Sequence, residues 1–580
     1  MPNTPTGLTA TAGNAQVSMT WNASAGATSY NVKRSTTSGG PYTTIGSPTT
    51  ASYTDTGVTN GTAYYYVVSA VNSAGESSNS AEVKATPIAP PAVPTGLTAT
   101  AGNAQVNLTW NASAGATSYN VKRSTTSGSG YSTISSPATN SYTDTAVTNG
   151  TAYYYVVSAV NSGGESGNSA EVKATPNAPP VQGATATIDF SNVHQTIRGF
   201  GGASAWMPVM SSLEVNTLFG TGSNQIGLSI LREWVEPSSV TGGSNWDTSV
   251  TNSQNAIAAG SNVIVMATPW TPPAAWKINI PNPSSPLAGG SLDPSHYADY
   301  ANYLESFVTY MANANPPVPL YGISMQNEPD ANVTYDSCVW TPAQMDTWVA
   351  NNSSVLTTKL IMPESQSFNT AYSDPALNDP NAVGKIGIVA GHLYGTTPTY
   401  YANAVNAGKD VWMTEHYLNP AGAQPAIGDA LQMAQEIHNS LTVADYNAYV
   451  WWWVADWNPG SGTTNTGLVD TTSTPTYFGW AMAQFARFIR PGYVRVDVAY
   501  STPNVYVSAY EGDGHFVIVA INMGTSIVSQ PFEIQNQSLS SLVPYQTTGS
   551  ATMAQQGEVS VTSNQFTYDL PAQSITTFVQ

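Results

Sequence analysis

The chain has 580 residues and a formal net charge of -19 at pH 7, which allows about two to four domains and disfavours nucleic acid and anionic membranes as partners. No run of about 18 apolar residues that could cross a membrane occurs in the sequence. The single cysteine, Cys338, excludes an intramolecular disulfide and a cysteine-based metal cluster, and we expect it to be a packed core residue.

The first 176 residues contain one segment that occurs twice. Trp21 recurs as Trp110, and the other landmarks of the segment are offset by the same 89 residues. Within each copy, short runs such as 17–21 alternate apolar and polar residues between Gly, Asn and Ser punctuation. The pattern predicts one all-β sandwich over residues 3–87 and another over residues 92–176.

Both copies resemble fibronectin type III modules. The resemblance is carried by the early tryptophan, by the Gly-Thr-Ala-Tyr-Tyr-Tyr run that begins at Gly61, and by the closing Lys-Ala-Thr-Pro. Proline holds a chain extended, so the Pro-rich segments 88–92 and 177–183 are predicted linkers. Neither copy has an evident catalytic constellation, and we expect both to act as spacers or weak polymer contacts.

After residue 184 the pattern changes to strands that alternate with helices. Tyr300, Leu304, Phe307 and Met311 recur along one face of one of these helical patterns. Eight βα units predict a (β/α)8 TIM barrel over residues 197–490. The eight strand-like runs are 198–202, 228–232, 262–268, 320–326, 359–363, 386–392, 410–414 and 448–453.

Strand patterns return at about residue 491, among them a hairpin predicted from residues 505–510 and 516–520. We expect residues 491–580 to form a β-sandwich side domain that is fused to the barrel. The strand-like segment 184–196 is expected to join the sheet of that domain. The predicted fold is therefore multidomain, with two all-β sandwiches followed by a barrel and its side domain.

Two glutamates lie where barrel strands end, the edge that carries the active site in this fold. Glu328 follows the fourth predicted strand and Glu415 the seventh. Their separation of 87 residues gives a normal repeat of 29 for each of three intervening units, so both carboxylates are expected at one mouth. Paired carboxylates at a mouth rich in aromatic residues are typical of glycosidic cleavage. A helix cap or a salt bridge explains either glutamate alone equally well.

Several motifs resemble glycoside hydrolase family 30, particularly its bacterial xylanase branch, subfamily 8, over about residues 187–580. They are Arg198–Gly202, Gln326–Asp330, His392–Gly395, Tyr449–Trp453 and Arg490–Val496. The segment around Glu328 also resembles the Asn-Glu-Pro acid/base motif of the wider clan A. The resemblance implies a retaining endo-β-1,4-xylanase that hydrolyses xylan or xylo-oligosaccharides by double displacement.

By position, the resemblance makes Glu328 the acid/base and Glu415 the nucleophile. It places Asn327 near the sugar 2-hydroxyl, where an amide hydrogen bond can strengthen in the transition state. Arg232 resembles the arginine whose charge keeps the nucleophile ionised, with an ordinary ion pair at the barrel rim as the alternative.

Further substrate contacts are expected from one histidine and from aromatic side chains on which sugar rings stack. Core packing is an equally good interpretation of each aromatic residue, and a buried structural role is the more common one for a strand histidine. The six histidines show no metal-binding spacing, so we expect no metal and no cofactor. The residues in question are Trp270, His392, Tyr394, Tyr417 and Trp452.

One departure from the branch bears on substrate choice. Its typical members hold a glucuronic acid side group of xylan with an arginine in the loop after strand eight. Here residues 450–486 contain neither Lys nor Arg, and Asp456 would repel a carboxylate. We therefore expect cleavage that does not depend on glucuronic acid.

Several alternatives remain open. One is a glucuronoxylan-specific endoxylanase, and others are a family 30 β-glucosidase, β-1,6-glucanase or glucosylceramidase. From a different class, the chain could be a non-catalytic carbohydrate-binding or adhesion protein. The low share of charged residues, 8%, fits a secreted protein, and we expect a monomer whose signal peptide is absent from this sequence.

Overall fold

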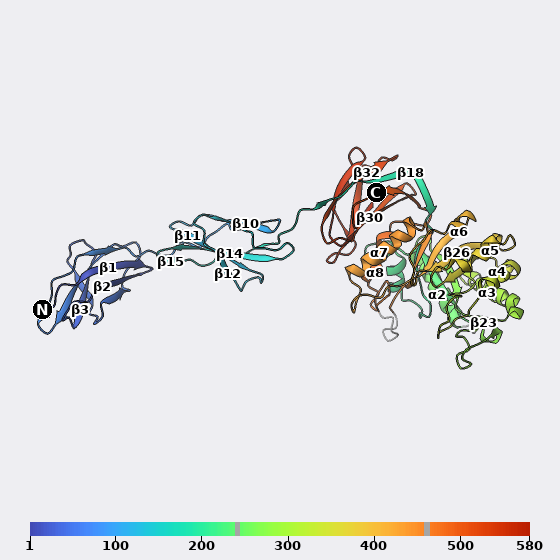
Figure 1. Ribbon diagram of the computed structural model, residues 1–580, viewed down its shortest axis with the longest axis horizontal. Coiled ribbons are helices and arrows are strands. Elements are labelled where there is room, and N and C mark those ends of the chain that lie inside the picture. The colour runs from blue at the N-terminus through green and yellow to red at the C-terminus, as the bar shows by residue number, and fades with distance from the viewer. Residues whose placement is uncertain (238–243, 457–464) are drawn as a thin grey trace. The chain divides into compact units, whose positions relative to one another are not determined.

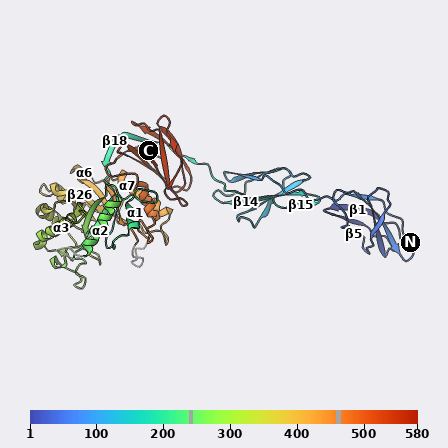
Figure 2. The same ribbon diagram turned by 180° about the vertical axis from the view of Figure 1, so that it is seen from behind.

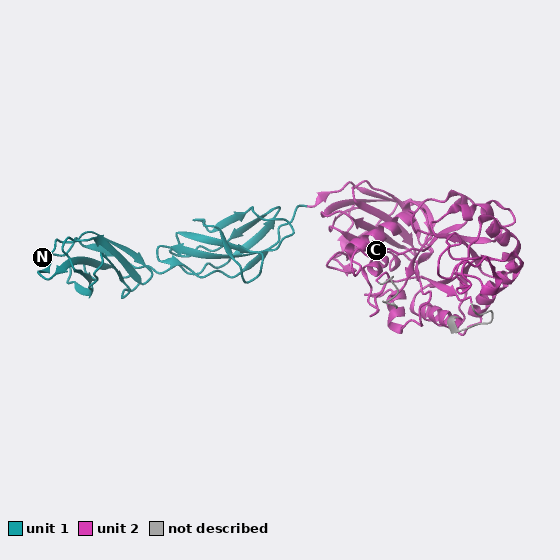
Figure 3. Cartoon of the chain, turned by 60° about the horizontal axis from the view of Figure 1, so that its bottom comes forward, with its two compact units in different colours: residues 1–179 teal, residues 180–580 magenta. Residues whose placement is uncertain are grey.

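The computed structural model describes residues 1–237, 244–456 and 465–580. The chain divides into two compact units, residues 1–179 and 180–580 (Figure 1, Figure 3). Within the described ranges, we find no helix that is both long enough and apolar enough to span a membrane.

Each copy of the N-terminal repeat forms two antiparallel sheets, one ordered β1-β2-β5 and one ordered β4-β3-β6-β7 with β8 beside β6 in the first copy. The strands of that copy are β1 (Thr6–Gly13), β2 (Gln16–Asn22), β3 (Ser29–Ser35), β4 (Thr43–Gly46), β5 (Ser52–Asp55), β6 (Tyr64–Asn72), β7 (Gly75–Glu76) and β8 (Val83–Ala85). The second copy has β9 (Thr98–Gly102), β10 (Gln105–Thr109), β11 (Ser118–Ser124), β12 (Ser132–Ser135), β13 (Ser141–Asp144), β14 (Tyr153–Asn161), β15 (Gly164–Glu165) and β16 (Val172–Ala174).

Residues from both sheets form one apolar core in each copy, because alternate side chains of each strand point inward. An edge-to-face aromatic pair lies in each core, Trp21 with Tyr30 in the first copy and Trp110 with Tyr119 in the second. The two tryptophans that revealed the sequence repeat therefore have the same packing role.

Eight parallel strands of the second unit close into a barrel, which confirms the predicted barrel. In order around the barrel they are β19 (Gly199–Ala203), β20 (Ile230–Val235), β21 (Ile264–Pro269), β24 (Leu320–Ser324), β25 (Lys359–Ser365), β26 (Ile386–His392), β27 (Asp410–Glu415) and β28 (Ala448–Trp453). Side chains such as Met266, Ile361 and Trp412 fill its interior, so the barrel is a packed core and not a pore.

Helices lie around the outside of the barrel strands (Figure 1, Figure 2). They are α1 (Ser212–Phe219), α2 (Ser244–Ala259), α3 (Tyr297–Ala312), α4 (Pro342–Asn352), α5 (Asp374–Asn378), α6 (Ala402–Asn406), α7 (Ile427–Thr442) and α8 (Tyr477–Ala486). The predicted apolar face of α3 is buried, and Cys338 is buried in the same core, as expected. Local sequence sets the helix starts, since Ser211 with Glu214 forms a capping box at α1.

Short elements occupy the loops between these strands and helices. They are β22 (Lys277–Ile278), β23 (Ser291–Leu292), η1 (Ala274–Trp276), η2 (Pro294–His296), η3 (Ser353–Val355), η4 (Thr370–Tyr372) and η5 (Val383–Lys385).

The C-terminal segment forms a large sheet together with the strand that precedes the barrel. The strands of this sheet are β17 (Val181–Gln182), β18 (Ala186–Thr196), β29 (Val494–Ala499), β30 (Val505–Gly512), β31 (His515–Asn522), β32 (Val528–Gln535), β33 (Ser541–Thr547), β34 (Ala554–Gln555), β35 (Val559–Ser560), β36 (Gln565–Leu570) and β37 (Ser574–Val579). β18 lies between β29 and β32 and leads directly into the first barrel strand. The predicted hairpin is formed by β30 and β31, and its turn uses positive φ angles at Asp513 and Gly514.

The predicted linker over residues 177–183 was wrong at its C-terminal end. Val181 and Gln182 form β17, which pairs in parallel with β32. Pro179 and Pro180 lack an amide hydrogen, but the amide of Val181 donates to the Ile527 carbonyl at 2.7 Å. Proline content predicted an unpaired segment, whereas the residues after the prolines have amides that pair with the edge of the sheet.

Candidate active site

The C-terminal ends of five barrel strands bring an arginine, a histidine and three carboxylates together. All five side chains are buried. Arg232 lies on β20, Glu364 on β25, His392 ends β26 and Glu415 ends β27, while Glu328 follows β24. Because parallel strands end at the same edge, residues far apart in sequence meet here, as the repeat spacing predicted.

The backbone at two of the carboxylates has an uncommon conformation. Glu328 and Glu364 have φ angles of 44° and 54°, in the left-handed region that non-glycine residues seldom adopt. The amide of Glu328 donates to the carbonyl of Glu364 at 3.0 Å. This bond joins the two left-handed residues and fixes the direction in which Glu328 leaves its strand.

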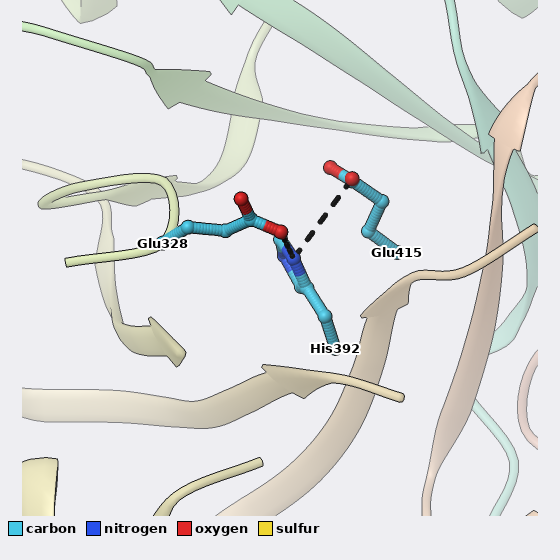
Figure 4. Close-up of side chains that lie close together, drawn as sticks. All are labelled: Glu328, His392 and Glu415. Carbon is cyan, nitrogen blue, oxygen red and sulfur yellow. Dashed lines mark hydrogen bonds and ion pairs between the residues drawn. The ribbon is translucent and has the colours of Figure 1, made fainter. Parts of the chain in front are cut away.

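The imidazole of His392 lies beside the carboxyl groups of Glu328 and Glu415, with one ring nitrogen facing both (Figure 4). Its Nδ1 is 3.1 Å from Oε1 of Glu328 and 3.9 Å from Oε1 of Glu415. One carboxyl oxygen from each glutamate and one ring nitrogen lie within 4.8 Å of one another. Retaining glycosidases separate their carboxyl groups by about 5 Å and inverting ones by about 6.5 to 9.5 Å, so this spacing suits retention.

Arg232 binds neighbouring groups of the site through all three of its nitrogens. Nη1 donates to Oε2 of Glu415 at 2.6 Å, Nη2 to Oδ1 of Asn327 at 2.7 Å, and Nε to Oγ1 of Thr268 at 3.2 Å. The indole of Trp270 covers the guanidinium, with 4.7 Å from Cζ to the ring centroid. Arg232 is therefore a buried structural centre of the site and not an ion pair at the rim.

Burial raises the pKa of Glu415, and this effect outweighs the opposing charges of His392 and Arg232. Arg232 does lower the pKa, as the sequence predicted, but not enough to bring it below the usual range of a glutamate. A carboxylate that resists ionisation in the free enzyme is a stronger base, and its attack on carbon relieves the cost of its buried charge.

Two tyrosine hydroxyls donate hydrogen bonds to Glu415 and Glu328. Tyr394 donates to Oε1 of Glu415 at 2.9 Å, and Tyr335 donates to Oε2 of Glu328 at 3.1 Å. Tyr394 was predicted as a sugar contact, and it lies at the site through this hydrogen bond. Tyr335 was not predicted, because nothing in its loop sequence distinguishes it. Its side chain is 45% exposed, so it can reach both Glu328 and solvent.

Aromatic side chains form a cluster beside these charged groups, with Trp206 at its centre. The Trp206 ring centroid lies 5.3 Å from that of Trp270 and 5.8 Å from those of Trp234 and Trp452. Tyr417 packs against the same cluster. Trp270 and Trp452 are only 1% and 8% exposed, so each has little free surface for a sugar ring. Trp206, which is half-buried and was not predicted, has more of its surface free.

His392 and Glu364 are both completely buried at this site. The burial of His392 agrees with the buried structural role given as the more common one for a strand histidine. Glu364 was missed, although it follows the fifth predicted strand as Glu328 and Glu415 follow theirs. Applying the strand-end criterion to every strand would have found it.

The proximity of Glu328, His392 and Glu415 would also suit a metal ion. However, Glu415 already accepts a hydrogen bond of 2.6 Å from the Arg232 guanidinium, and that positive charge opposes a second cation. Tyr335 and His392 engage both oxygens of Glu328. The donor set therefore fits acid–base chemistry better than metal binding.

The loop after β28 was expected to lack a partner for a carboxylate substituent. Residues 457–464 of this loop lie outside the described residues. The Asp456 carboxylate accepts the amide of Gly467 at 2.9 Å and that of Thr466 at 3.2 Å, so it closes the loop on itself. Its predicted repulsion of a substituent is thus weaker than a free carboxylate would produce, because these amides partly offset its charge.

The comparisons with known proteins cover most of the chain. The glucuronoxylanase XynC of Bacillus subtilis (strain 168) is 38% identical over 417 residues, which are 70% of this chain and 94% of XynC. Among solved structures, the family 30 subfamily 8 xylanase Xyn30A from Clostridium acetobutylicum matches with a TM-score of 0.62 and 43% identity, over 68% of this chain and 99% of Xyn30A. A family 30 endoxylanase from Clostridium papyrosolvens C71 matches with a TM-score of 0.61 and 39% identity, over 68% of this chain and 99% of the endoxylanase chain. No family model matches the sequence.

Proposed function

The chain belongs to the xylanases of glycoside hydrolase family 30, and from that premise we propose that Glu328 and Glu415 make it a retaining endo-β-1,4-xylanase. The observation that carries this proposal is the pair of carboxylates beside His392, with oxygens within 4.8 Å of each other and of its ring nitrogen. That spacing leaves room for one anomeric carbon and not for an additional water.

In the first step a carboxylate oxygen of Glu415 attacks the anomeric carbon, and the bond from that carbon to the leaving oxygen breaks. Glu328 donates its proton to this oxygen, so the shortened xylan leaves as an alcohol. In the second step Glu328 takes a proton from water, and the water oxygen displaces Glu415 from the sugar. The configuration at the anomeric carbon is inverted twice and is therefore retained.

The surrounding residues support each step in this scheme. Arg232 and Tyr394 bind both oxygens of Glu415, so the nucleophile is held in one orientation. The amide oxygen of Asn327 accepts a hydrogen bond from Arg232, so the NH2 group of Asn327 is left to bind the sugar 2-hydroxyl. We infer that Trp206 offers an aromatic surface to a bound xylose ring.

We further propose that the enzyme belongs to subfamily 8 but does not require glucuronic acid side groups. The support is the sequence of the loop after β28, since residues 450–486 contain no Lys or Arg to pair with a carboxylate. An anchor supplied by a different loop would make the enzyme glucuronoxylan-specific.

Product analysis on two polymers tests both parts of the proposal. The enzyme should release reducing ends from glucuronoxylan and from arabinoxylan at comparable rates, with products cut at many positions. Cleavage restricted to bonds near glucuronic acid would contradict the proposed independence. Turnover of β-glucosides or β-1,6-glucan without turnover of xylan would replace the proposed substrate.

A non-catalytic carbohydrate-binding protein remains the alternative from another class. A binding protein has no need for two buried carboxylates so near each other, since each carries a desolvation cost. Hydrolysis of xylan that is lost in Glu328→Gln and Glu415→Gln would exclude this alternative, and equal rates in the variants would favour it.

For the remaining parts of the chain, we propose two fibronectin type III modules and a β-sandwich side domain. Two facing sheets around a Trp-Tyr pair in each N-terminal copy support the first assignment. We also propose that the enzyme is secreted, because polymeric xylan cannot enter a cell before it is cut, and that it acts as a monomer.

A further inference from the structure

The proposed mechanism gives no role to Glu364, although this residue lies against Arg232, Thr268 and His392 at the centre of the site. Its Oε2 accepts a hydrogen bond of 2.9 Å from Thr268, and its Oε1 lies 3.4 Å from Nη2 of Arg232. The same Oε1 is 4.0 Å from Nε2 of His392. The Glu364 side chain is 0% exposed, so it cannot touch substrate.

Two polar atoms in this region face each other without conventional hydrogen bonds. Among the described residues, neither Nε2 of His392 nor Oε1 of Glu364 has a hydrogen-bond partner. An unpaired buried N–H or carboxylate oxygen costs free energy, and that cost falls when the two groups carry opposite charges. The pairing therefore favours a protonated imidazole beside an ionised Glu364.

Charge counting supports the same assignment. The ionisable groups around His392 are Glu328, Glu364, Glu415, Arg232, the Tyr394 hydroxyl and Asp330, and burial raises the pKa of Asp330. A resting enzyme needs a protonated acid and an ionised nucleophile. With Glu364 also ionised, the two negative charges balance the charges of Arg232 and a protonated His392. Without the charge of Glu364, the buried site would carry an excess positive charge whenever His392 is protonated.

The protonation of His392 matters because its Nδ1 faces both catalytic glutamates. During the first step the negative charge moves from Glu415, which becomes an ester, to Glu328, which loses its proton. An Nδ1–H group that lies 3.1 Å from one carboxylate and 3.9 Å from the other can donate to whichever is ionised. A neutral ring with its proton on Nε2 could not donate in this way.

We propose that Glu364 is a positioning residue that supplies the buried negative charge needed to keep His392 protonated beside Glu328 and Glu415. The inference deepens the proposed xylanase mechanism and rests on it for its kinetic consequence. Its structural part, the protonation of His392, does not depend on which sugar the enzyme cleaves. The pKa directions agree with an ionised Glu364 beside a protonated His392: the charges of Arg232 and His392 lower the pKa of Glu364 despite its burial, and Glu415 and Glu328 raise the pKa of His392 despite its burial. The contribution of Glu364 to the charge of His392 rests on the 4.0 Å approach of Oε1 to Nε2.

Nuclear magnetic resonance of the full chain with 15N-labelled histidine tests this inference. The chain has six histidines, and the His392 signals are identified by their loss in His392→Asn. In Glu364→Gln the midpoint of the His392 titration should fall by about 1 to 3 pH units. In Glu233→Gln, which alters another buried glutamate that binds Ser204 and Ser253, the midpoint should stay at the wild-type value.

Kinetics on xylan provide the second readout. Glu364→Gln should lower kcat by about 10²-fold with little change in KM, because substrate does not touch Glu364. Glu364→Asp retains the charge at a greater distance and should recover part of the activity and part of the titration shift. If Glu364→Gln does not fold, Glu364→Asp alone must show a His392 midpoint below that of the wild type.

An unchanged His392 midpoint in a folded Glu364 variant would overturn the inference, whatever its activity. A wild-type enzyme that does not cleave xylan would instead contradict the proposed function. In that case the comparison of His392 midpoints would still decide whether Glu364 controls the histidine.

Discussion

The guanidinium of Arg232 and the carboxylate of Glu415 are joined by a hydrogen bond of 2.6 Å. Both side chains are buried, and the same guanidinium also binds Asn327 and Thr268. A lysine has a single ammonium group and cannot bind three partners in these directions. We expect Arg232→Lys to lower kcat on xylan by about 10²- to 10³-fold while the chain stays folded. An activity near that of the wild type would show that the three hydrogen bonds of the guanidinium are not needed.

The direction in which an Arg232 variant shifts the pH dependence of activity can also be predicted. Glu415 must be ionised to attack, and burial already raises its pKa despite the opposing charges of His392 and Arg232. Removing a positive charge in Arg232→Gln raises the pKa further, so activity should fail at a higher pH on the acid side. The acid limb of the kcat/KM profile is the measurement, and a limb that moves to lower pH would contradict this prediction.

The two glutamates should respond differently to the leaving group of the substrate. Glu328→Gln removes the proton donor, so we expect xylan hydrolysis to fall by at least about 10²-fold. An aryl xylobioside whose phenol leaves without protonation should still react with this variant in the first step, seen as a burst of phenol. Glu415→Gln should show neither activity. A burst in Glu415→Gln but not in Glu328→Gln would reverse the two roles.

Removal of metal ions should leave the enzyme unaffected. The carboxylates and the histidine at the site are engaged by Arg232, Tyr335 and Tyr394. We therefore expect the same rate on xylan before and after dialysis against a strong chelator. A loss that is restored by one added divalent cation would assign a metal to these side chains.

The free energy of unfolding should fall in acid because the buried His438 must take up a proton. Burial, together with the charge of Arg495, lowers the pKa of His438 to about 4, while an unfolded histidine titrates near about 6.5. The unfolded chain therefore binds the proton more readily, and stability is lost as pH falls from about 6.5 towards 4. The full difference corresponds to about 3 kcal/mol.

Thermal unfolding at pH 7 and pH 4.5 measures this effect. His438→Gln can keep the hydrogen bond that His438 makes with the Tyr500 hydroxyl at 3.0 Å, and it should lose less stability between the two pH values than the wild type. The exposed His515 provides a matched control, since His515→Gln should behave as the wild type does. Equal acid losses in all three proteins would contradict the assignment to His438.

The sequence was sufficient to predict the barrel and the meeting of Glu328 with Glu415 because both depend on local patterns. Strand and helix periods alternate with a regular repeat, and that repeat places Glu328 and Glu415 at one edge. The hairpin at residues 505–520 followed equally well from its turn residues. These features need no knowledge of which side chains meet across the barrel.

Other parts of the site depend on contacts that no local pattern contains. Trp270 was expected either to stack on sugar or to pack in the core, and its ring covers Arg232, a residue 38 positions earlier. Tyr335 reaches Glu328 from a loop whose course is set by tertiary packing. Glu364 could have been found from its place at a strand end, but its connection to both Arg232 and His392 required the coordinates.

Trapping the covalent intermediate is the most direct test of the central claim that Glu415 is the nucleophile of a retaining xylanase. A 2-fluoroxylobioside with a good leaving group should inactivate the enzyme, because the fluorine slows the second step more than an activated leaving group slows the first. Mass spectrometry of the digested protein should then find one fluoroxylobiosyl group on the peptide that contains Glu415. A label on another carboxylate, or steady turnover with no label, would contradict the account.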